Sequence, residues 1–238
     1  MNLKKNINDI LFLDIETVPE KEFWEELTEE TKGLFEKKTA YQRKGDITAK
    51  DYYERAGIWA EFGKIICISV AYIDQHTSNR NLRVTSFYGN NERQILRDFK
   101  ALLENHFSQS KHLLCAHNGK EFDFPYIARR MIIHQIELPS KLNLFGKKPW
   151  EVRHLDTMEL WKFGDYKHYT SLQLLASILG IPSPKDDIDG SDVARVYYKE
   201  KNMSKIVNYC EKDTITLAQL LLRFNNENLI QEKDIIRV

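Results

Sequence analysis

The chain has 238 residues, 42% of them hydrophobic, and a formal net charge of zero at pH 7. A chain of this size and apolar content can bury one substantial core, so we expect one globular domain over residues 1–238. The neutral charge balance excludes the global basic field that marks tight, processive nucleic-acid binders.

The cysteines and the N-terminal segment indicate the compartment. Cys67, Cys115 and Cys210 fall in apolar stretches without paired spacing, which favours buried free thiols over disulfides or a zinc site. The apolar run at residues 10–13 is too short for a signal-peptide core or a membrane span. We therefore expect a cytoplasmic protein that does not associate with membranes.

The first predicted strand, residues 10–15, runs into two acids, Asp14 and Glu16. Side chains alternate along a strand, so both carboxylates share one face at a backbone separation of about 7 Å. They could converge on one bound ion, or they could be solvated acids at a surface strand end. An Asp-x-Glu triplet is too common to decide between these alternatives.

Residues 20–62 are charged, rich in helix formers and interspersed with aromatic side chains. This composition predicts a helical insertion between the first and second strands. Because it leaves directly from Pro19, the insertion is expected to lie near the acids of the first strand. Its simplest role would be to cover an exposed sheet edge.

The next elements alternate between strands and helices. Four further strands are predicted from apolar runs, at residues 64–72, 82–88, 113–116 and 152–155. Helical periodicity covers residues 92–107, with Asn91 as the cap, and residues 124–134. Another helix is expected to be capped by Thr170 and ended by Gly180. This order predicts an α/β fold.

A second polar motif, residues 117–126, follows the predicted fourth strand. It contains Asn118 and Asp123, and Asp123 precedes Phe124 and a proline. Asp123 would also fit as a helix N-cap. Asn118 and Gly119 could simply form a turn.

A third motif lies in the last predicted helix, whose apolar stripe spans residues 203–224. Tyr209 and Asp213 are four residues apart and therefore share a face. They fall on the flank of the stripe, where a side chain can reach the rim of a cleft. By itself, Tyr209 would also fit as a half-buried residue at a core edge.

Together the three motifs resemble those of the DEDD superfamily of 3′-to-5′ exonucleases. Asp14 and Glu16 match the first motif, Asp123 the second and Asp213 the third, while Tyr209 corresponds to the tyrosine subclass (DEDDy). The chain is similar to the exonuclease domains of family B DNA polymerases, and more narrowly to a bacterial group of stand-alone predicted exonucleases. The resemblance spans residues 10–222.

This resemblance implies a ribonuclease H-like fold with a mixed five-stranded sheet flanked by helices, and two divalent ions, Mg²⁺ or Mn²⁺. Asp14 would bridge both ions, Glu16 and Asp213 would hold the ion that activates water, and Asp123 would support the second ion. Tyr209 would orient the attacking water. The chemistry agrees, because two ions can activate water and stabilise the leaving oxygen. Without metal, two carboxylates 4 Å apart would repel by about 4 kcal/mol at an effective dielectric of 20.

The resemblance also implies a nucleic-acid partner, with Thr17 and Asn118 beside the substrate. We expect single-stranded 3′ ends, DNA rather than RNA, with release of nucleoside 5′-monophosphates. Trimming of RNA 3′ ends is the alternative enzymatic activity. Discrimination between DNA and RNA depends on how the shape of the pocket accommodates the 2′-hydroxyl, and the sequence does not distinguish the two. A binding module with little catalysis is the alternative of another class. In the exonuclease, we expect the insertion at residues 20–62 to limit which 3′ ends enter the active site.

Only a short polar tail, residues 225–238, follows the third motif. We therefore expect no polymerase part in this chain, and any action with a polymerase or repair complex would be in trans.

Two further clusters have open roles. Asp156 fits a helix cap or a buried hydrogen-bonding acid better than a fifth metal ligand. An aromatic cluster could stack single-stranded bases or pack at the core rim, and it contains Trp161, Phe163, Tyr166, His168 and Tyr169. Basic residues that could contact phosphates or simply be solvated are Lys120, Arg129, Arg130, Lys147, Lys148, Lys162 and Lys167.

Overall fold

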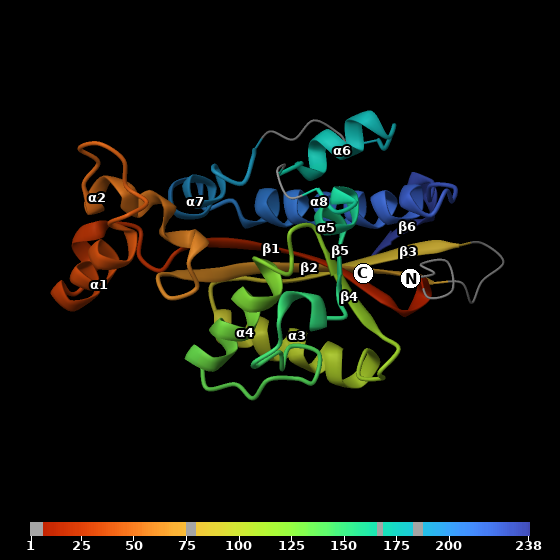
Figure 1. Ribbon diagram of the computed structural model, residues 1–238, viewed down its shortest axis with the longest axis horizontal. Coiled ribbons are helices and arrows are strands. Elements are labelled where there is room, and N and C mark those ends of the chain that lie inside the picture. Colours follow the sequence, from red (N-terminus) through yellow and green to blue (C-terminus); the bar gives the residue numbers. More distant parts are fainter. Residues whose placement is uncertain (1–6, 75–79, 166–168, 183–187) are drawn as a thin grey trace.

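The computed structural model describes residues 7–74, 80–165, 169–182 and 188–238. Within these residues, six strands form one mixed sheet in the order β5-β4-β1-β2-β3-β6 (Figure 1). The strands are β1 (Ile10–Pro19), β2 (Gly63–Asp74), β3 (Asn81–Tyr88), β4 (Leu113–Ala116), β5 (Leu155–Asp156) and β6 (Ile235–Arg237). The predicted mixed α/β architecture is confirmed.

Two details of the predicted sheet were wrong. The count of five strands missed β6, which pairs in parallel with β3 at Leu82–Val84 inside the segment expected to be a polar tail. A strand of three residues carries too little alternation to be recognised. The fifth strand begins at Leu155 rather than residue 152, because β4 pairs with it only at Leu155 and Asp156 and the Leu114 amide donates instead to the side chain of His154.

The helices lie on both faces of the sheet (Figure 1). Helices α3 and α4 cover one face, and α8 crosses the other, with α6 on its outer side and α5 beside it. The helix bounds are α1 (Glu29–Thr39), α2 (Ala49–Tyr52), α3 (Glu92–His106), α4 (Asp123–Ile133), α5 (Thr157–Lys162), α6 (Leu172–Ile178), α7 (Val193–Arg195) and α8 (Met203–Phe224). None of the helices in the described part of the chain is long and apolar enough to cross a bilayer.

The N-cap residues of α3 and α6 can be compared directly with those predicted from the sequence. The Asn91 side chain accepts a hydrogen bond from the Gln94 amide, so the predicted cap of α3 is confirmed. The predicted cap at Thr170 was wrong by one residue, because the Ser171 side chain caps α6 by accepting from Leu174. Two adjacent hydroxyl residues offer the same local signal, and only the backbone path decides between them.

Alternation along β1 sorts its side chains between two cores. Leu11 and Leu13 pack in the cluster that includes α3 and α4 residues. Ile10 and Phe12 pack in the cluster that includes Leu217 of α8. Continuous apolar character over these first residues is typical of a central strand covered on both faces. Asp14 and Glu16 continue the row of Phe12 and therefore face α8.

The predicted insertion between β1 and β2 is present and contains α1, α2 and the 3-10 segments η3 (Trp24–Glu26) and η4 (Tyr53–Ile58). Phe35 is fully buried at its centre. The ring of Phe35 meets four other aromatic rings edge-on at centroid distances of 5.1–5.8 Å, those of Trp24, Tyr53, Trp59 and Phe62. Such contacts contribute beyond the buried area alone. The insertion therefore has a small aromatic core of its own, at the far end of β1 (Figure 1).

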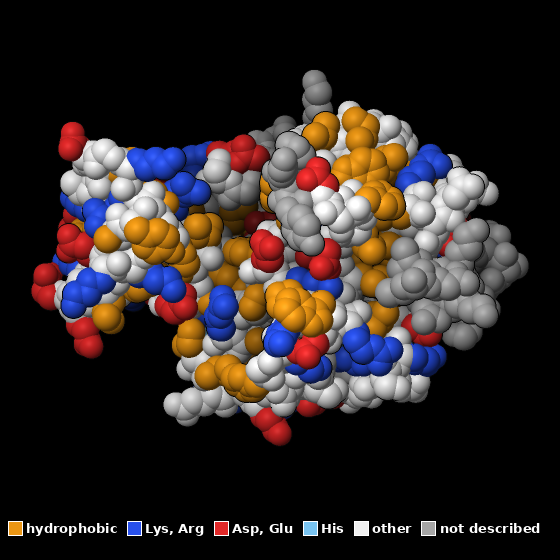
Figure 2. Space-filling view, in the orientation of Figure 1, with side chains coloured by type: hydrophobic (Ala, Val, Ile, Leu, Met, Phe, Trp, Pro, Cys, Tyr) orange, Lys and Arg blue, Asp and Glu red, His pale blue; other side chains and the backbone are white. Residues whose placement is uncertain are grey.

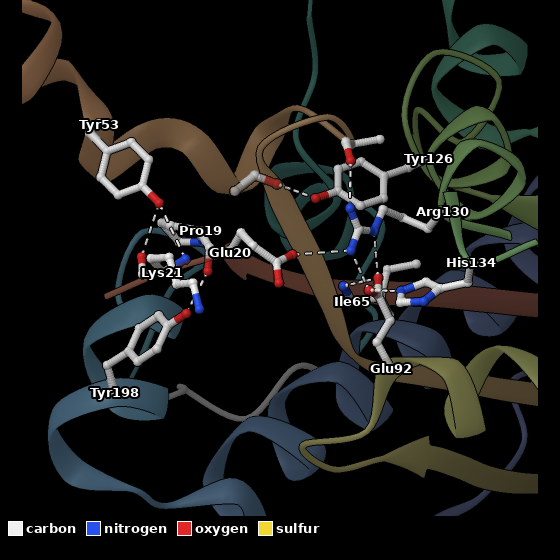
Figure 3. A network of polar contacts seen from close by, with 12 residues as sticks. Pro19, Glu20, Lys21, Tyr53, Ile65, Glu92, Tyr126, Arg130, His134 and Tyr198 are labelled. Atoms are coloured by element: carbon white, nitrogen blue, oxygen red, sulfur yellow. Dashed lines mark hydrogen bonds and ion pairs between the residues drawn. The ribbon is translucent and has the colours of Figure 1, made fainter. Parts of the chain in front are cut away.

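A buried polar network joins the insertion, the sheet and two helices (Figure 3). The Arg130 guanidinium on α4 binds both carboxylate oxygens of Glu92 at the start of α3, and it also donates to the Ala60 carbonyl at 2.9 Å. It donates further to Glu20 at 3.1 Å, directly after β1. Glu92 accepts from the Ile65 amide of β2 at 2.7 Å. This network fixes the orientation of α4 relative to the end of β1.

Removing the cation of this network should be costly. Arg130→Met leaves the Glu92 carboxylate buried without its guanidinium, so we expect the free energy of unfolding to fall by about 3–5 kcal/mol. Lys50→Met, which breaks the exposed pair with Glu25, is the control and should leave the free energy of unfolding close to that of wild type. Urea denaturation measures both variants. Similar small losses in the two variants would show that the buried pair carries no special stability.

Candidate active site

The first and third motifs meet where β1 passes under α8. The ligand atoms of Asp14, Glu16 and Cys210 all lie within 4.8 Å of one another. The Cys210 thiol donates to a carboxylate oxygen of Asp14 at 3.4 Å. Burial raises the pKa of this thiol, so it stays protonated and acts as a donor. The protonated thiol is a poor ligand for hard cations, which leaves the carboxylates as the metal-binding groups.

The second motif reaches the same place from the neighbouring strand. Strand β4 is parallel to β1, so the carboxyl ends of both strands lie at the same edge of the sheet. Helix α4 begins there at Asp123, whose carboxylate hydrogen-bonds with the backbone of Ile15 on β1. The alternative of Asp123 as the N-cap was wrong, because the N-cap position is Phe122 and makes no side-chain capping bond. Asp123 is therefore held against β1.

Asp156 shapes the loop that carries Asn118. Its carboxylate is buried and accepts hydrogen bonds from the amides of Asn118 and Lys120 at 3.0 and 3.1 Å. The same carboxylate caps α5 by accepting from Met158 and Glu159. The expectation of a cap and buried hydrogen-bonding acid is confirmed. With four amide donors, this side chain has little capacity left for a metal.

The loop itself has two unusual features. Asn118 adopts a left-handed backbone conformation with φ of 64°, which asparagine tolerates better than most residues. Gly119 packs so tightly that a Cβ there would lie 2.3 Å from the Cβ of Ala116. The Oδ1 atom of Asn118 is buried and has no hydrogen-bond partner within the described residues. Such an orphaned acceptor is available to a bound group.

Thr17 is used differently from what the motif suggests. Its hydroxyl donates to the Gly57 carbonyl of the insertion at 2.8 Å, and the Tyr126 hydroxyl of α4 donates to the same carbonyl at 2.8 Å. A register shift between β1 and β2 falls between Glu16 and Thr17. The structure thus places Thr17 at the joint between β1 and the insertion, and a substrate contact by Thr17 stays a prediction.

The pKa values show how closely the acids interact. Burial is the main cause that raises the pKa of Asp14, and the charges of Asp123 and Asp213 raise it further. Burial also raises the pKa of Glu16, with added repulsion from Asp14 and Asp213. The pKa of Asp123 rises to about 7, mainly through burial. The four predicted acids therefore share one electrostatic environment, although they come from three distant segments.

Tyr209 belongs to the same environment. Burial raises the pKa of its phenol, and repulsion from Asp213, Glu16 and Asp14 and a side-chain hydrogen bond with Asp213 raise it further. The phenol therefore stays protonated at neutral pH and keeps a hydrogen to donate. The structure brings Tyr209 beside three of the four acids, Asp213, Glu16 and Asp14.

Two features of this region are not predicted by the sequence, the Cys210 thiol beside Asp14 and the joint at Gly57. Cys210 was assigned only to the apolar stripe of its helix, yet its thiol contacts Asp14. Its position directly after Tyr209 was the available signal. The joint at Gly57 left no signal in the sequence, because it depends on backbone packing, with Val18 backbone atoms 3.1 Å from the position of a Cβ at Gly57.

The aromatic cluster after β5 is only partly described, because residues 166–168, with Tyr166, Lys167 and His168, lie outside the described residues. Trp161 stacks on Phe224 of α8, with ring centroids 5.8 Å apart and planes at 15°. This contact is the rim packing that was one of the two alternatives. Phe163 and Tyr169 are largely exposed, at 91% and 72%.

The protein is thus a mixed α/β domain that gathers carboxylates from β1, α4 and α8 in one site. A sequence family described as a predicted 3′-5′ exonuclease related to the exonuclease domain of PolB matches residues 58–233. The chain belongs to this family. The matched range contains Asn118, Asp123, Tyr209 and Asp213, whereas Asp14 and Glu16 precede it.

Among solved structures, the chain is similar to a family B DNA polymerase from the hyperthermophilic archaeon Pyrobaculum calidifontis. The TM-score is 0.54 and the sequence identity is 17%. The similarity covers 90% of this chain and 24% of the polymerase, so this chain corresponds to about a quarter of that protein. It supports a ribonuclease H-like fold of the kind found in polymerase exonuclease domains.

The raised pKa of Asp123 predicts a pH-dependent stability in chelator. Between the ordinary value of 3.8 and the folded value of about 7, the folded protein binds a proton that the unfolded chain releases. The free energy of unfolding should therefore fall as pH rises through this window. Asp123→Asn removes this loss, so at pH 8 with EDTA we expect the variant to be more stable than wild type by about 2–4 kcal/mol.

Urea denaturation at pH 5 and pH 8 tests this expectation, and the exposed Asp98→Asn on α3 is the control. The advantage of Asp123→Asn should be larger at pH 8 than at pH 5. An advantage that does not change with pH would contradict the raised pKa.

Proposed function

We propose that the protein is a metal-dependent 3′-to-5′ exonuclease that removes nucleoside 5′-monophosphates from single-stranded DNA. The observation that carries this proposal is the convergence of Asp14, Glu16, Asp123 and Asp213 with the protonated phenol of Tyr209. Mutual repulsion among buried carboxylates is costly to a fold, which makes a purely structural role for the cluster a poor explanation. Membership of the exonuclease family supports the same reaction.

The donor set fits two hard divalent cations, Mg²⁺ or Mn²⁺, because it consists of carboxylate oxygens on rigid elements. Asp14, Glu16, Asp123 and Asp213 would hold the ions. When bound, these ions would supply an activated water and neutralise charge on the leaving oxygen. Tyr209 would donate its hydrogen bond to position the attacking water. Asn118, with its orphaned Oδ1, and Thr17 would contact the substrate.

The preference for DNA rests on the similarity to a DNA polymerase. Trimming of RNA 3′ ends is the alternative within the same chemistry. We further propose that the whole chain acts as one exonuclease domain in the cytoplasm. It would serve a polymerase or a repair complex in trans.

Digestion of matched 5′-labelled single-stranded DNA and RNA oligonucleotides with Mg²⁺, Mn²⁺ or EDTA tests the reaction. Wild type should give a ladder that shortens from the 3′ end of DNA only with metal. Asp14→Ala should lower the rate by about 1,000-fold or more, because several kcal/mol of charge stabilisation is lost. Asp98→Ala, on the exposed face of α3, should retain full activity. No cleavage by folded wild type with either metal would refute the proposal, and faster cleavage of RNA would favour the alternative.

Tyr209→Phe separates water positioning from metal binding. The variant keeps the ring but loses the hydroxyl, so we expect turnover to fall by about 10- to 100-fold, as for one lost hydrogen bond to a charged group. The rise in melting temperature on adding Mn²⁺ should stay close to that of wild type, because the four carboxylates are intact. Tyr197→Phe is the control, because the Tyr197 hydroxyl donates to Asn90 and not to the acids. Loss of the Mn²⁺-induced rise in Tyr209→Phe would instead make Tyr209 part of the metal site.

A further inference from the structure

A cavity of about 780 Å³ opens beside the candidate active site, between α4, α5 and the segment that joins α4 to β5. Its walls are largely apolar and include Ile132, Leu138, Leu144 and Phe145. The volume is in the range of pockets that bind small organic groups. Phe145 is 74% exposed and Ile132 is 47% exposed, so part of this apolar wall faces solvent.

Basic side chains line the same cavity. Arg129, Lys147 and Lys162 contribute to its lining, and within the described residues none of the three has a carboxylate at ion-pair distance. Lys120 also lines it but is already paired with Glu159 at 2.5 Å. Three unpaired cations around an apolar wall favour an anionic ligand with apolar faces.

The lining holds four carboxylates and four basic side chains, so its formal charges balance, but two of the carboxylates are already engaged. Asp156 accepts four backbone hydrogen bonds, and the charge of Glu159 is matched by Lys120. Glu121 and Asp165 are the other carboxylates of the lining. The cavity therefore remains suited to phosphate groups at its basic side.

An exposed tryptophan extends this surface beyond the cavity. Trp150 is 74% exposed and lies next to Pro149, which lines the cavity. The Lys148 amino group lies 5.3 Å from the centre of the Trp150 ring. Figure 2 shows hydrophobic side chains near the centre of this face, over the segment between α4 and α5, bordered by both Lys or Arg and Asp or Glu side chains. Aromatic faces beside cations are the usual surface for single-stranded bases and their phosphates.

The cavity adjoins the candidate active site through the loop of Asn118, although none of the four acids lines it. Asn118 and Asp156 both line it, and the loop of Asn118 leads into Asp123. A strand whose 3′ end lies at Asp14 and Asp123 can therefore pass Asn118 and enter the cavity with its preceding nucleotides. The orphaned Oδ1 of Asn118 lies at this passage.

We propose that this cavity and the adjoining Trp150 form a binding surface for the single strand on the 5′ side of the cleaved bond. Phe145 and Trp150 would stack on bases, and Arg129, Lys147 and Lys148 would contact phosphates. Such recognition tolerates any base sequence. The proposal rests on the proposed exonuclease function, because it assigns the path of that enzyme's substrate.

Binding without cleavage is the first test. The full chain is titrated in EDTA against a 5′-fluorescein-labelled single-stranded DNA 12-mer, with anisotropy as the readout. We compare Lys147→Glu/Lys148→Glu and Phe145→Ala/Trp150→Ala with a charge-matched control, Arg93→Glu/Arg97→Glu, on the exposed face of α3. Circular dichroism and melting temperature verify that each variant is folded.

The lysine variant should bind more weakly, and the slope of log K against log salt should decrease in magnitude by about 1.4, or about 0.7 for each lost phosphate contact. The aromatic variant should lose about 5- to 100-fold in affinity, as for one stacked base, with little change in slope. The control should bind like wild type. Affinities of both test variants equal to the control would overturn the proposal and leave the surface to a protein partner.

Cleavage of two substrates separates this proposal from the function on which it rests. The p-nitrophenyl ester of thymidine 5′-monophosphate has no preceding nucleotides, whereas the unlabelled 12-mer does. Both test variants should lose kcat/KM on the 12-mer by about 10-fold or more and keep the wild-type rate on the ester. Equal losses on both substrates would overturn the proposed surface. If wild type cleaves neither substrate, the exonuclease function fails, and the anisotropy titration still decides whether the surface binds a single strand.

Discussion

The placement of two carboxylates, one half-buried and one buried, on a central strand is the constraint around which this molecule is arranged. Asp14 and Glu16 lie on the face of β1 that α8 covers, where loss of water disfavours their charged forms. Asp123 and Asp213 add repulsion to Asp14 from two other segments. A fold can keep such a cluster only if stable packing elsewhere offsets the cost. The apolar first half of β1, covered on both faces, supplies that packing.

Two sets of hydrogen bonds, made by the buried side chains of Asp156 and Arg130, hold the second motif against this strand. Asp156 fixes the loop before Asp123 by accepting from the amides of Asn118 and Lys120. Arg130 fixes the helix after Asp123 by binding Glu92 and the Ala60 carbonyl. Asp123 therefore has little freedom to move away from its charged neighbours. This preorganisation favours binding of a cation, because the carboxylates need not be gathered when the cation arrives.

The insertion ties the far end of β1 to the same framework. Its Gly57 carbonyl accepts from both Thr17 on β1 and Tyr126 on α4. The family match begins at residue 58, so most of the insertion lies outside the range shared with that family. The cavity beside α4 lies within the matched range.

The sequence by itself determined the elements whose signals are local. Alternation in β1 placed Asp14 and Glu16 on one face, and the four-residue spacing in α8 placed Tyr209 beside Asp213, because these periods arise from backbone geometry alone. Only the tertiary structure decided that Arg130 binds Glu92, that Asp156 holds Asn118, and that Thr17 joins Gly57. Each of these contacts joins residues 38 to 40 positions apart, and no local period encodes such partners. The three-residue β6 also depends on tertiary structure, because it is a strand only through its pairing with β3.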